Sequence, residues 1–587
     1  MAIAIRQSKS IHGIDINNNE HKIILYADDT TICVNDKESI PEVVKVITAF
    51  SHLAGPRLNM RKTRGIWLGP LKDHGIRVMA GVTFTGKPVK CLGIYLGHDN
   101  KRCIDMNWNY RLEKLTKYIH HLDKLNLSFF VKVSVIKCHI VSKFVYPASV
   151  LSVPEEIIKS LQSKIYKFLW NGKTEKVKRA LLCNTILNGG INMVNIHAFM
   201  EAIKASWITK IITIPGKWSD IFHMNAKYIG LPLEYIIKLS VSKIENFPIL
   251  KAFPMFYQEI LMSYFKSKSV KPFNKLTPHE IFLQPLWGNE HFKIKESNLY
   301  LKNWVKENIM YVKDLVTLDG SFFDENEIYK TIENKSNIIQ EMYIIKRYVL
   351  KRFKHIDSKI GNHVNIKESY VILSGNTLFD LRDKKSKFFY KMLVKKNTVR
   401  ANMESIYARE FHFQNSMQNW QSIYQQKLCF KGFNEVKYFN FKLIHNFLPC
   451  GNVLNKWQKR ISKYCDLCNE IESLRHMLYD CPHIKQIWLN ISNIIDCNIN
   501  WKLIVCGFIN YELTDKIIAY NFIFSVIAYS IFKENSKCKF NGKRLEIENI
   551  MFSIKRMIYT YYITLEMLNT NLLFNYLKKI LCNFDEV

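Results

Sequence analysis

The 587-residue sequence has no long uninterrupted apolar segment of the kind that crosses a membrane. Its longest apolar stretch, residues 517–532, is short for that purpose and contains Asn521, Ser525 and Ser530. The first ten residues lack the apolar stretch after a basic start that marks a secretory signal peptide. We therefore expect 517–532 to form a buried helix, and we expect no membrane partner.

The cysteines lack the paired spacing of a secreted disulfide scaffold. Fourteen are spread over the chain, and most stand alone among apolar neighbours, as do Cys138, Cys183, Cys506 and Cys582. Scattered thiols of this kind suit a reducing compartment. We therefore expect an intracellular protein of the cytoplasm and nucleus.

Acidic residues are few relative to basic ones. The sequence has 84 Lys and Arg against 51 Asp and Glu, which gives a formal net charge of +33. Such an excess favours a polyanionic partner, most simply nucleic acid. A general compositional bias toward Lys, Asn and Ile is the alternative explanation. The hydrophobic share of 48% supplies enough material for packed cores, and the length suggests several domains.

Short strands are concentrated in the first hundred residues. β-Branched runs predict strands at 14–16, 22–26, 30–34 and 89–96, the last broken at Gly93. A polar turn at 17–20 is expected to join the first two. Pro41 is expected to open a helix that places Val44, Ile47 and Leu53 on one side.

From about residue 105 the pattern is helical almost to the end of the chain. Apolar side chains recur at steps of three and four in two clear segments, first at Leu112, Leu115, Ile119 and Leu122, then at Ile157, Leu161, Ile165 and Phe168. This periodicity predicts amphipathic helices. Strands in one region followed by helices in the rest predict an α+β fold.

Two adjacent carboxylates, Asp28 and Asp29, stand between two apolar strands. An Asp-Asp pair is often only a turn, and that interpretation remains open. Here the strands on both sides predict a rigid hairpin with both carboxylates at its tip. Their repulsion favours a divalent cation, and Mg²⁺ prefers carboxylate oxygens. Two metals held in this way can activate a 3′-hydroxyl and stabilise a leaving pyrophosphate.

Four segments in the first hundred residues resemble the reverse transcriptases of LINE-type (non-LTR) retrotransposons, and they occur in the order of that family. They are residues 2–13 (AIAIRQSKSIHG), 25–34 (LYADDTTICV), 58–69 (LNMRKTRGIWLG) and 89–97 (VKCLGIYLG). The resemblance implies the latter part of a polymerase palm, ending in a primer-grip hairpin. It also implies an enzyme that copies RNA into DNA, with an RNA template and a DNA primer or target as partners.

The resemblance assigns roles to individual residues. Asp28 and Asp29 would bind Mg²⁺, and Lys62 would be the general acid for the pyrophosphate. Lys62 has a simpler alternative as a surface residue in a turn. The primer grip would consist of Leu92, Gly93, Ile94 and Tyr95. Glycine there would allow a close approach of the primer strand, or would mark an ordinary β-bulge.

A third carboxylate, on an earlier palm strand, completes the metal site in this family. The acidic residues before Asp28 are Asp15 and Glu20, and both flank the Asn-rich turn. Neither lies in the apolar strand setting that the family uses. The family's N-terminal endonuclease and fingers regions are also missing from this sequence. We therefore expect that this chain alone is inactive as a polymerase.

The next segment, between Trp108 and Trp170, resembles the thumb of the family and predicts helices with basic faces. The basic residues are Arg111, Lys114, Lys117, Lys124, Lys132, Lys137, Lys143, Lys159, Lys164 and Lys167. Their alternative role is a solvated surface without a ligand. Residues 178–207, around Asn188-Gly189-Gly190, match the family's following segment.

A second chemical signal lies far from the first. Cys465 and Cys468 are separated by two residues, His476 follows after seven more, and Cys481 after another four. Two Cys at this spacing form a tight knuckle, and the His and third Cys complete a tetrahedral Cys₃His zinc site. A chance cluster and a redox pair at Cys465 and Cys468 are weaker alternatives. His483 is a possible substitute ligand.

Residues 441–457 (FKLIHNFLPCGNVLNKW) and 465–488 resemble the C-terminal zinc region of LINE-type polymerases. The site is closed, so the expected zinc is structural. Basic residues accompany Trp457 and Trp488, a combination suited to base stacking and phosphate contact. They are Lys456, Lys459, Arg460, Lys463, Arg475 and Lys485.

The sequence thus predicts an N-terminally shortened LINE-type reverse transcriptase in five segments. These are the palm half (1–104), a thumb-like helical domain (105–215), a helical connecting region (216–424), the zinc-binding region (425–495) and a C-terminal helical region (496–587). Two other interpretations are an inactive, basic, zinc-containing nucleic-acid-binding remnant and a zinc-stapled helical scaffold for protein partners.

Overall fold

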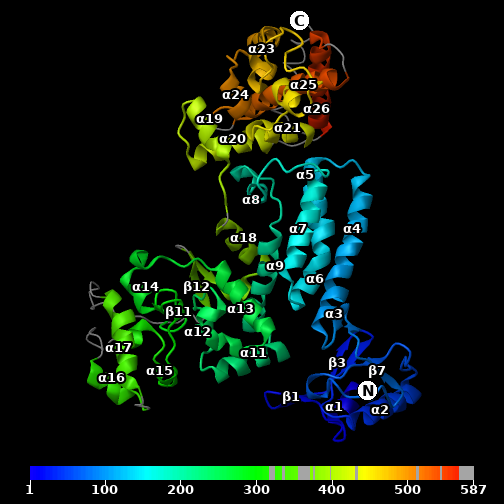
Figure 1. Cartoon of the computed structure of the whole chain (residues 1–587), viewed down its shortest axis with the longest axis vertical. Helices are drawn as coiled ribbons and strands as arrows, with labels where there is room; N and C mark the ends of the chain where they lie inside the picture. Colours follow the sequence, from blue (N-terminus) through cyan, green and yellow to red (C-terminus); the bar gives the residue numbers. More distant parts are fainter. Residues whose placement is uncertain are drawn as a thin grey trace. The chain divides into compact units, whose positions relative to one another are not determined.

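The computed structural model describes residues 1–315, 324–333, 337–353, 370–374, 377–396, 398–429, 434–509, 514–541 and 545–567. The fold is mainly helical with several small strand pairs, which confirms the predicted α+β class (Figure 1). The chain forms two compact units. Unit 1 contains 1–118, 141–162 and 196–396, and unit 2 contains 119–140, 163–195 and 397–587. The five-segment division remains a prediction.

Unit 1 begins with two separate β-hairpins. Their strands are β1 (Ile14–Ile16), β2 (Asn19–His21), β3 (Ile23–Tyr26) and β4 (Asp29–Ile32). β1 pairs with β2, and β3 pairs with β4, both antiparallel. The turn predicted at 17–20 was expected to join the strand at 14–16 to the strand at 22–26. That connection was wrong, because the turn joins β1 to β2. Asn17 and Asn18 have φ of 55° and 60°, which suits the tight two-residue turns of hairpins.

A small core lies beside these hairpins. It joins Ile5 of α1 (Ala2–Gln7), Ile23 of β3, and Val43 and Ile47 of α2 (Ser39–Ala54). The helix predicted at Pro41 is therefore present. Leu53 was expected on the same side of this helix as Ile47, but it is 89% exposed near the end of α2, whereas Ile47 is buried.

The remaining strands of the first hundred residues form two more sheets. β5 (Arg64–Gly65), β7 (Val82–Phe84) and β6 (Val78–Met79) form a three-stranded sheet in that order. β8 (Val89–Cys91) and β9 (Ile94–Leu96) form a hairpin, so the predicted interruption at Gly93 is its turn. β10 (Lys293–Ile294), β11 (Ser297–Asn298), β12 (Val371–Ser374) and β13 (Thr377–Asp380) form two further pairs.

The large core of unit 1 lies among helices. Trp287, Trp304, Tyr235 and Tyr264 are almost fully buried in it. The α-helices that belong wholly or partly to this unit, after α1 and α2, are α3 (Asn100–Ile104), α4 (Tyr110–Asp123), α6 (Ser142–Val150), α7 (Glu155–Leu169), α9 (Ile196–Ala205), α10 (Trp207–Thr213), α11 (Lys217–Tyr228), α12 (Leu233–Ile236), α13 (Met255–Ser267), α14 (Pro278–Phe282), α15 (Lys302–Lys306), α16 (Glu325–Thr331), α17 (Ile338–Tyr348) and α18 (Ser386–Lys396). α9 packs against α13 and α18.

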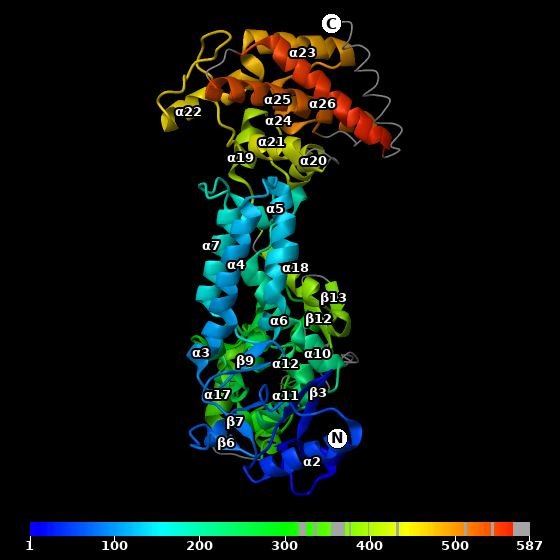
Figure 2. The same ribbon diagram turned by 90° about the vertical axis from the view of Figure 1, so that its right-hand side faces the viewer.

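Unit 2 is built around one long helix, α25 (Asp515–Asn541) (Figure 2). This helix packs against α20 (Met417–Leu428), α21 (Asn434–Ile444), α24 (Trp501–Cys506) and α26 (Ile547–Met567). Its α-helices, besides the parts of α4 and α7, are α5 (Phe129–Val135), α8 (Arg179–Cys183), α19 (Asn402–Glu410), α20 (Met417–Leu428), α21 (Asn434–Ile444), α22 (Gly451–Trp457), α23 (Pro482–Ile495), α24 (Trp501–Cys506), α25 and α26 (Ile547–Met567). α25 is long and apolar enough to cross a membrane, but 72% of its most apolar window is buried inside the protein. The prediction of a buried helix at 517–532 is thus confirmed.

Both amphipathic patterns form helices, α4 and α7, with Leu112, Leu115, Ile157 and Leu161 buried. The basic residues are less uniform than predicted. Lys132 is 4% exposed, and its ammonium donates hydrogen bonds to the Phe168 carbonyl and to Asn171. Its assignment to a solvent-facing basic face was therefore wrong, because this amine completes the end of α7.

Candidate metal centre

The four predicted zinc ligands converge in unit 2. Cys465 and Cys468 lie on the loop after α22, His476 begins a short π-helix (His476–Asp480), and Cys481 directly precedes α23. Their ligand atoms all lie within 4.8 Å of one another. Among the residues that the structure describes, these four form the one group of three or more His, Cys, Asp or Glu side chains that could hold a metal ion.

The distances fit a tetrahedral zinc ion. The Sγ atom of Cys481 lies 3.9 Å from the Sγ atoms of both Cys465 and Cys468. Zinc–sulfur bonds in a tetrahedron separate the sulfurs by about 3.8 Å. Cys468 Sγ and His476 Nε2 are 3.1 Å apart, where zinc would require about 3.6 Å, so binding needs a shift of about half an ångström between these two groups.

Backbone hydrogen bonds shape the first knuckle. The Cys465 amide donates to the Glu470 carbonyl at 2.7 Å, and the Asn469 amide donates to the Cys465 carbonyl at 2.9 Å. Asn469 has a φ of 60°, a left-handed conformation that Asn tolerates better than most residues. Tyr464 and Ile471 form a β-bridge that closes the loop. Backbone hydrogen bonds and this bridge therefore position the two cysteines.

Hydrogen bonding separates the thiol pKa values. The bond between Cys465 and Cys481 lowers the pKa of Cys481, and the backbone amides of His483 and Ile484 at the start of α23 lower it further. The same bond, together with burial, raises the pKa of Cys465. Burial raises the pKa of Cys468. A thiolate at Cys481 is the form that a metal ion requires.

A carboxylate orients the histidine. His476 Nδ1 lies 3.4 Å from a Glu470 carboxylate oxygen, while Nε2 faces Cys468. Carboxylates in this position commonly fix the tautomer of a zinc-binding histidine. His483 is exposed and does not belong to the cluster, so it is not the substitute ligand that the sequence allowed. The convergence of His476 and Cys481 on the knuckle also favours a metal site over a redox pair.

The loop is attached to its surroundings by Glu472, which is fully buried. Its carboxylate accepts hydrogen bonds from the Gly451 amide at 2.6 Å and from Asn535 Nδ2 at 2.9 Å. It also lies 3.2 Å from Lys539 Nζ, whose side chain is only 3% exposed. This contact network connects the metal loop to α22 and α25. Glu472 could not be recognised from the sequence, because its partners on α25 lie far away along the chain.

The two tryptophans predicted to stack on bases differ. Trp488 is 2% exposed and donates to the Leu478 carbonyl at 2.8 Å, so its assignment to a binding surface was wrong. Trp457 is 59% exposed at the end of α22.

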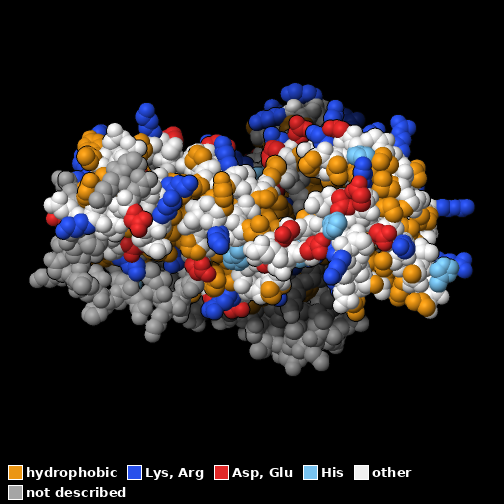
Figure 3. All heavy atoms as spheres, turned by 90° about the horizontal axis from the view of Figure 1, so that it is seen from below, with side chains coloured by type: hydrophobic (Ala, Val, Ile, Leu, Met, Phe, Trp, Pro, Cys, Tyr) orange, Lys and Arg blue, Asp and Glu red, His pale blue; other side chains and the backbone are white. Residues whose placement is uncertain are grey.

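On the face drawn in Figure 3, Lys and Arg side chains are interspersed with acidic and hydrophobic ones.

The predicted polymerase residues lie in unit 1, and the two carboxylates lie on the hairpin of β3 and β4. Tyr26 pairs with Asp29, so Ala27 and Asp28 form the turn, with a φ of 50° at Ala27. Both carboxylates are exposed at the hairpin tip, as the sequence placed them. Neither belongs to a group of three potential metal ligands among the described residues. Their assignment to magnesium stays a prediction.

The predicted primer-grip hairpin is held by polar contacts. Leu92 and Gly93 form its turn, with φ of 46° and 81°. Tyr146 donates to the Leu92 carbonyl at 2.8 Å, and Arg111 donates to the Gly93 carbonyl at 3.0 Å. Asn107 accepts from the Tyr95 amide at 2.9 Å and donates to its carbonyl at 2.7 Å.

Two hairpins of the predicted polymerase site are neighbours. Thr31 of β4 and Cys91 of β8 lie 3.5 Å apart through their Oγ1 and Sγ atoms. Lys62 lies exposed in a turn between α2 and β5, with its amide donating to Asn59. Lys62 is therefore a surface residue, and its role as proton donor stays a prediction.

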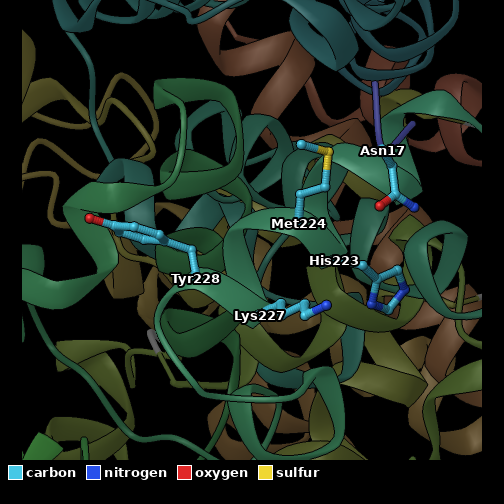
Figure 4. Close-up of a pocket in the computed structure, with 5 residues that line it drawn as sticks. All are labelled: Asn17, His223, Met224, Lys227 and Tyr228. Atoms are coloured by element: carbon cyan, nitrogen blue, oxygen red, sulfur yellow. The ribbon is translucent and has the colours of Figure 1, made fainter. Parts of the chain in front are cut away.

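A surface depression of about 510 Å³ in unit 1 carries no recognisable chemistry (Figure 4). Asn17, His223, Met224, Lys227 and Tyr228 line it. Figure 4 shows His223 beside Asn17, while Tyr228 extends away from them. This lining offers one cation and no carboxylate, so it does not form a second metal site.

A protein family and a transposon protein match parts of the chain. Residues 385–488 match the family described as zinc-binding in reverse transcriptase, and this segment includes all four cluster residues. The Transposon TX1 uncharacterized 149 kDa protein of Xenopus laevis is 22% identical over 327 residues. That alignment covers 53% of this chain and 24% of the relative, so the chain matches about a quarter of the relative's length.

The chain is similar to the C-terminal region of a LINE-type reverse transcriptase. The resemblance inferred from the sequence is thereby confirmed. The match to the reverse transcriptase zinc-binding family extends from just before α18 through the first half of α23. Asp28, Asp29, Lys62 and the grip hairpin lie outside that segment, so their roles in a reverse transcriptase stay predictions.

Proposed function

We propose that the chain is a zinc-stabilised, nucleic-acid-binding part of a LINE-type reverse transcriptase. The observation that carries this proposal is the convergence of Cys465, Cys468, His476 and Cys481 within a segment matching the zinc-binding family of reverse transcriptases. All four tetrahedral positions would be filled by protein atoms. The zinc would therefore supply stability to the loop and leave no position open for a substrate or a reactive water.

The partners that we propose are an RNA template and a DNA primer or target. Resemblance to reverse transcriptases implies nucleic-acid partners in general, and the charge of +33 supports them. We further propose a reducing intracellular location in the cytoplasm and nucleus. The thirteen cysteines in the described ranges are free thiols, a state compatible with that setting.

Copying of RNA into DNA is the activity that the resemblance implies for a complete polymerase of this type. Asp28 and Asp29 would contribute two carboxylates to Mg²⁺, Lys62 would protonate the leaving pyrophosphate, and residues 92–95 would contact the primer. Two carboxylates are too few for the two-metal arrangement. The described residues bring no third ligand to them, so the residues present do not fit a complete magnesium site.

Metal analysis of the purified chain tests the zinc site. We expect about one equivalent of zinc in the chain and in the matched control His483→Ala. Cys468→Ser should lose most of it, because a tetrahedral site missing one thiolate binds far less tightly. Full zinc content in Cys468→Ser would contradict the ligand assignment.

Binding to RNA and single-stranded DNA tests the second half of the proposal. The logarithm of the binding constant should fall linearly with the logarithm of salt concentration, because phosphate contacts release counterions. Sequence preference should be weak. Affinity that is unchanged from low to high salt, or absent for both nucleic acids, would instead favour a zinc-stapled scaffold for protein partners.

A further inference from the structure

Two exposed aromatic side chains flank the segment that leads into the metal centre. Trp457 is the last residue of α22 and is 59% exposed. Tyr464 directly precedes Cys465 and is 41% exposed. Burial of such rings normally stabilises a fold, so their exposure leaves apolar surface available to a ligand.

Cations surround these rings. The Lys176 ammonium lies 4.7 Å from the centre of the Trp457 ring, and the Lys463 ammonium lies 5.1 Å from the centre of the Tyr464 ring. The two segments involved, 173–176 and 456–464, both belong to unit 2. We call them together the Trp457 surface. Its exposed cations are Lys173, Lys176, Lys456, Lys459, Arg460 and Lys463.

Nearby carboxylates do not neutralise these cations. Glu175 forms an ion pair with Arg179 at 2.6 Å, and Asp466 lies 3.8 Å from the buried ammonium of Lys539. Glu470 faces His476 of the metal centre. Within the described ranges, none of the six cations forms an ion pair with a carboxylate. The Trp457 surface therefore keeps a positive charge available to an anionic partner.

We infer that the Trp457 surface binds single-stranded nucleic acid, with a base stacked on Trp457 and neighbouring phosphates held by the surrounding cations. This inference rests on the proposed function and gives it a location. Aromatic rings among cations suit single strands, because unpaired bases offer flat faces for stacking. In a duplex those faces are covered by the adjacent base pairs. An acidic peptide would satisfy the cations but would leave the indole ring without a stacking partner.

The test compares variants of the zinc-loaded full chain by fluorescence anisotropy. The probes are labelled oligothymidylate, labelled oligouridylate and a labelled DNA duplex of equal length. Trp457→Ala should weaken binding of both single strands by about tenfold, whereas Trp457→Phe should retain most of the affinity. The matched control is Phe552→Ala, which removes a ring that is 69% exposed on α26. Duplex binding should change by less than about twofold.

A charge series checks the phosphate contacts. Replacing Lys176 and Lys463 together by Ala should reduce the slope of log affinity against log salt by about 1.4 for single strands. Replacing Lys72 and Lys87, two exposed lysines of unit 1, should leave that slope nearly unchanged.

The inference would be overturned if Trp457→Ala bound single strands as Phe552→Ala does. Equal weakening of single-strand and duplex binding by Trp457→Ala would also overturn it. So would a competition experiment in which the same polyglutamate concentration displaces single strands from the original chain and from Trp457→Ala. In each case salt-dependent binding by the original chain would leave the proposed function standing. Loss of all nucleic-acid binding by the original chain would remove both.

Discussion

The Nδ1 atom of His476 lies 3.4 Å from the Glu470 carboxylate, while Nε2 of the same ring faces Cys468 at 3.1 Å. The ring is thus held from both nitrogens. Glu470 is 70% exposed, so its contact with the ring remains open to water and is weaker than a buried one. The contact of Glu470 with Nδ1 still orients the ring so that Nε2, the nitrogen that would bind zinc, faces Cys468.

Replacement of Glu470 by Gln should weaken zinc binding by about tenfold, because the histidine loses the charged group that fixes its tautomer. The measurement is transfer of zinc to a competing coloured chelator. Asp480→Asn is the matched control, since Asp480 is a neighbouring carboxylate that pairs with Arg475 instead. Equal zinc affinity in the two variants would show that Glu470 does not orient His476.

Removal of the Glu472 carboxylate should destabilise the zinc-loaded chain by about 3 kcal/mol. Glu472→Ala takes away the nearer carboxylate of the buried Lys539 ammonium, which keeps only Asp466 at 3.8 Å, and it frees the Gly451 amide. The free energy of unfolding in urea measures the loss. Adding Lys539→Met should restore part of the lost stability, because the buried charge that has lost its nearer carboxylate is then removed. A double variant no more stable than Glu472→Ala would contradict this account.

Lys427 predicts a pH dependence in unit 2. It is fully buried and donates to the Leu503 and Ile504 carbonyls, and burial lowers its pKa to about 7. The unfolded chain keeps this proton up to about pH 10.4, so between the two values the unfolded state binds more protons and folding stability rises with pH.

We therefore expect the chain to gain stability relative to Lys427→Met between pH 7 and pH 9, at up to about 1.4 kcal/mol per pH unit. Below about pH 6 the difference should be constant, because Lys427 is then protonated in both states. Urea unfolding at several pH values provides the measurement. A difference that is flat across this range would show that Lys427 titrates normally.

The turn of the grip hairpin should respond to substitution through the backbone alone. Gly93 has a φ of 81°, and an added Cβ would meet Tyr146 only at an ordinary contact distance of 3.9 Å. Gly93→Ala should therefore cost about 1 kcal/mol through conformational strain. Gly93→Asn should cost less, since Asn tolerates left-handed backbone better. Thermal unfolding of the two variants distinguishes strain from a steric clash, which would make Asn the worse residue.

Primer extension tests the polymerase assignment. We expect no extension of a DNA primer on an RNA template with Mg²⁺, because Asp28 and Asp29 have no third ligand among the described residues. The control is a chain with both residues changed to Ala, which should behave identically. Robust extension that disappears in this control would show that another carboxylate, such as Asp15 or one supplied in trans, completes the site.

The sequence predicted features that depend on spacing along the chain. The separation of Cys465, Cys468, His476 and Cys481 was sufficient to predict their convergence, because a short loop limits how far the ligands can spread. Steps of three and four likewise predicted α4 and α7. Both patterns are local, so they can be recognised without knowledge of the tertiary structure.

Features that depend on distant contacts were not predictable. Glu472 meets Asn535 across 63 positions of the chain, and no local pattern distinguishes it from an exposed acid. Two consecutive Asn residues did indicate a turn, but their left-handed conformation closes a much shorter hairpin than expected. Trp488 was misassigned because a Trp beside basic residues has the same sequence pattern whether buried or exposed.

The buried amine of Lys132 changes how the net charge relates to binding. Lys204 and Lys427 are also buried, and Lys539 is held against Glu472 inside unit 2. Such ammonium groups serve as internal donors to carbonyls or carboxylates and cannot approach a phosphate. An ionic-strength titration counts only cations that reach the ligand. The number of ions released on binding is therefore set by the exposed cations of a local surface, and the formal charge of +33 overstates it.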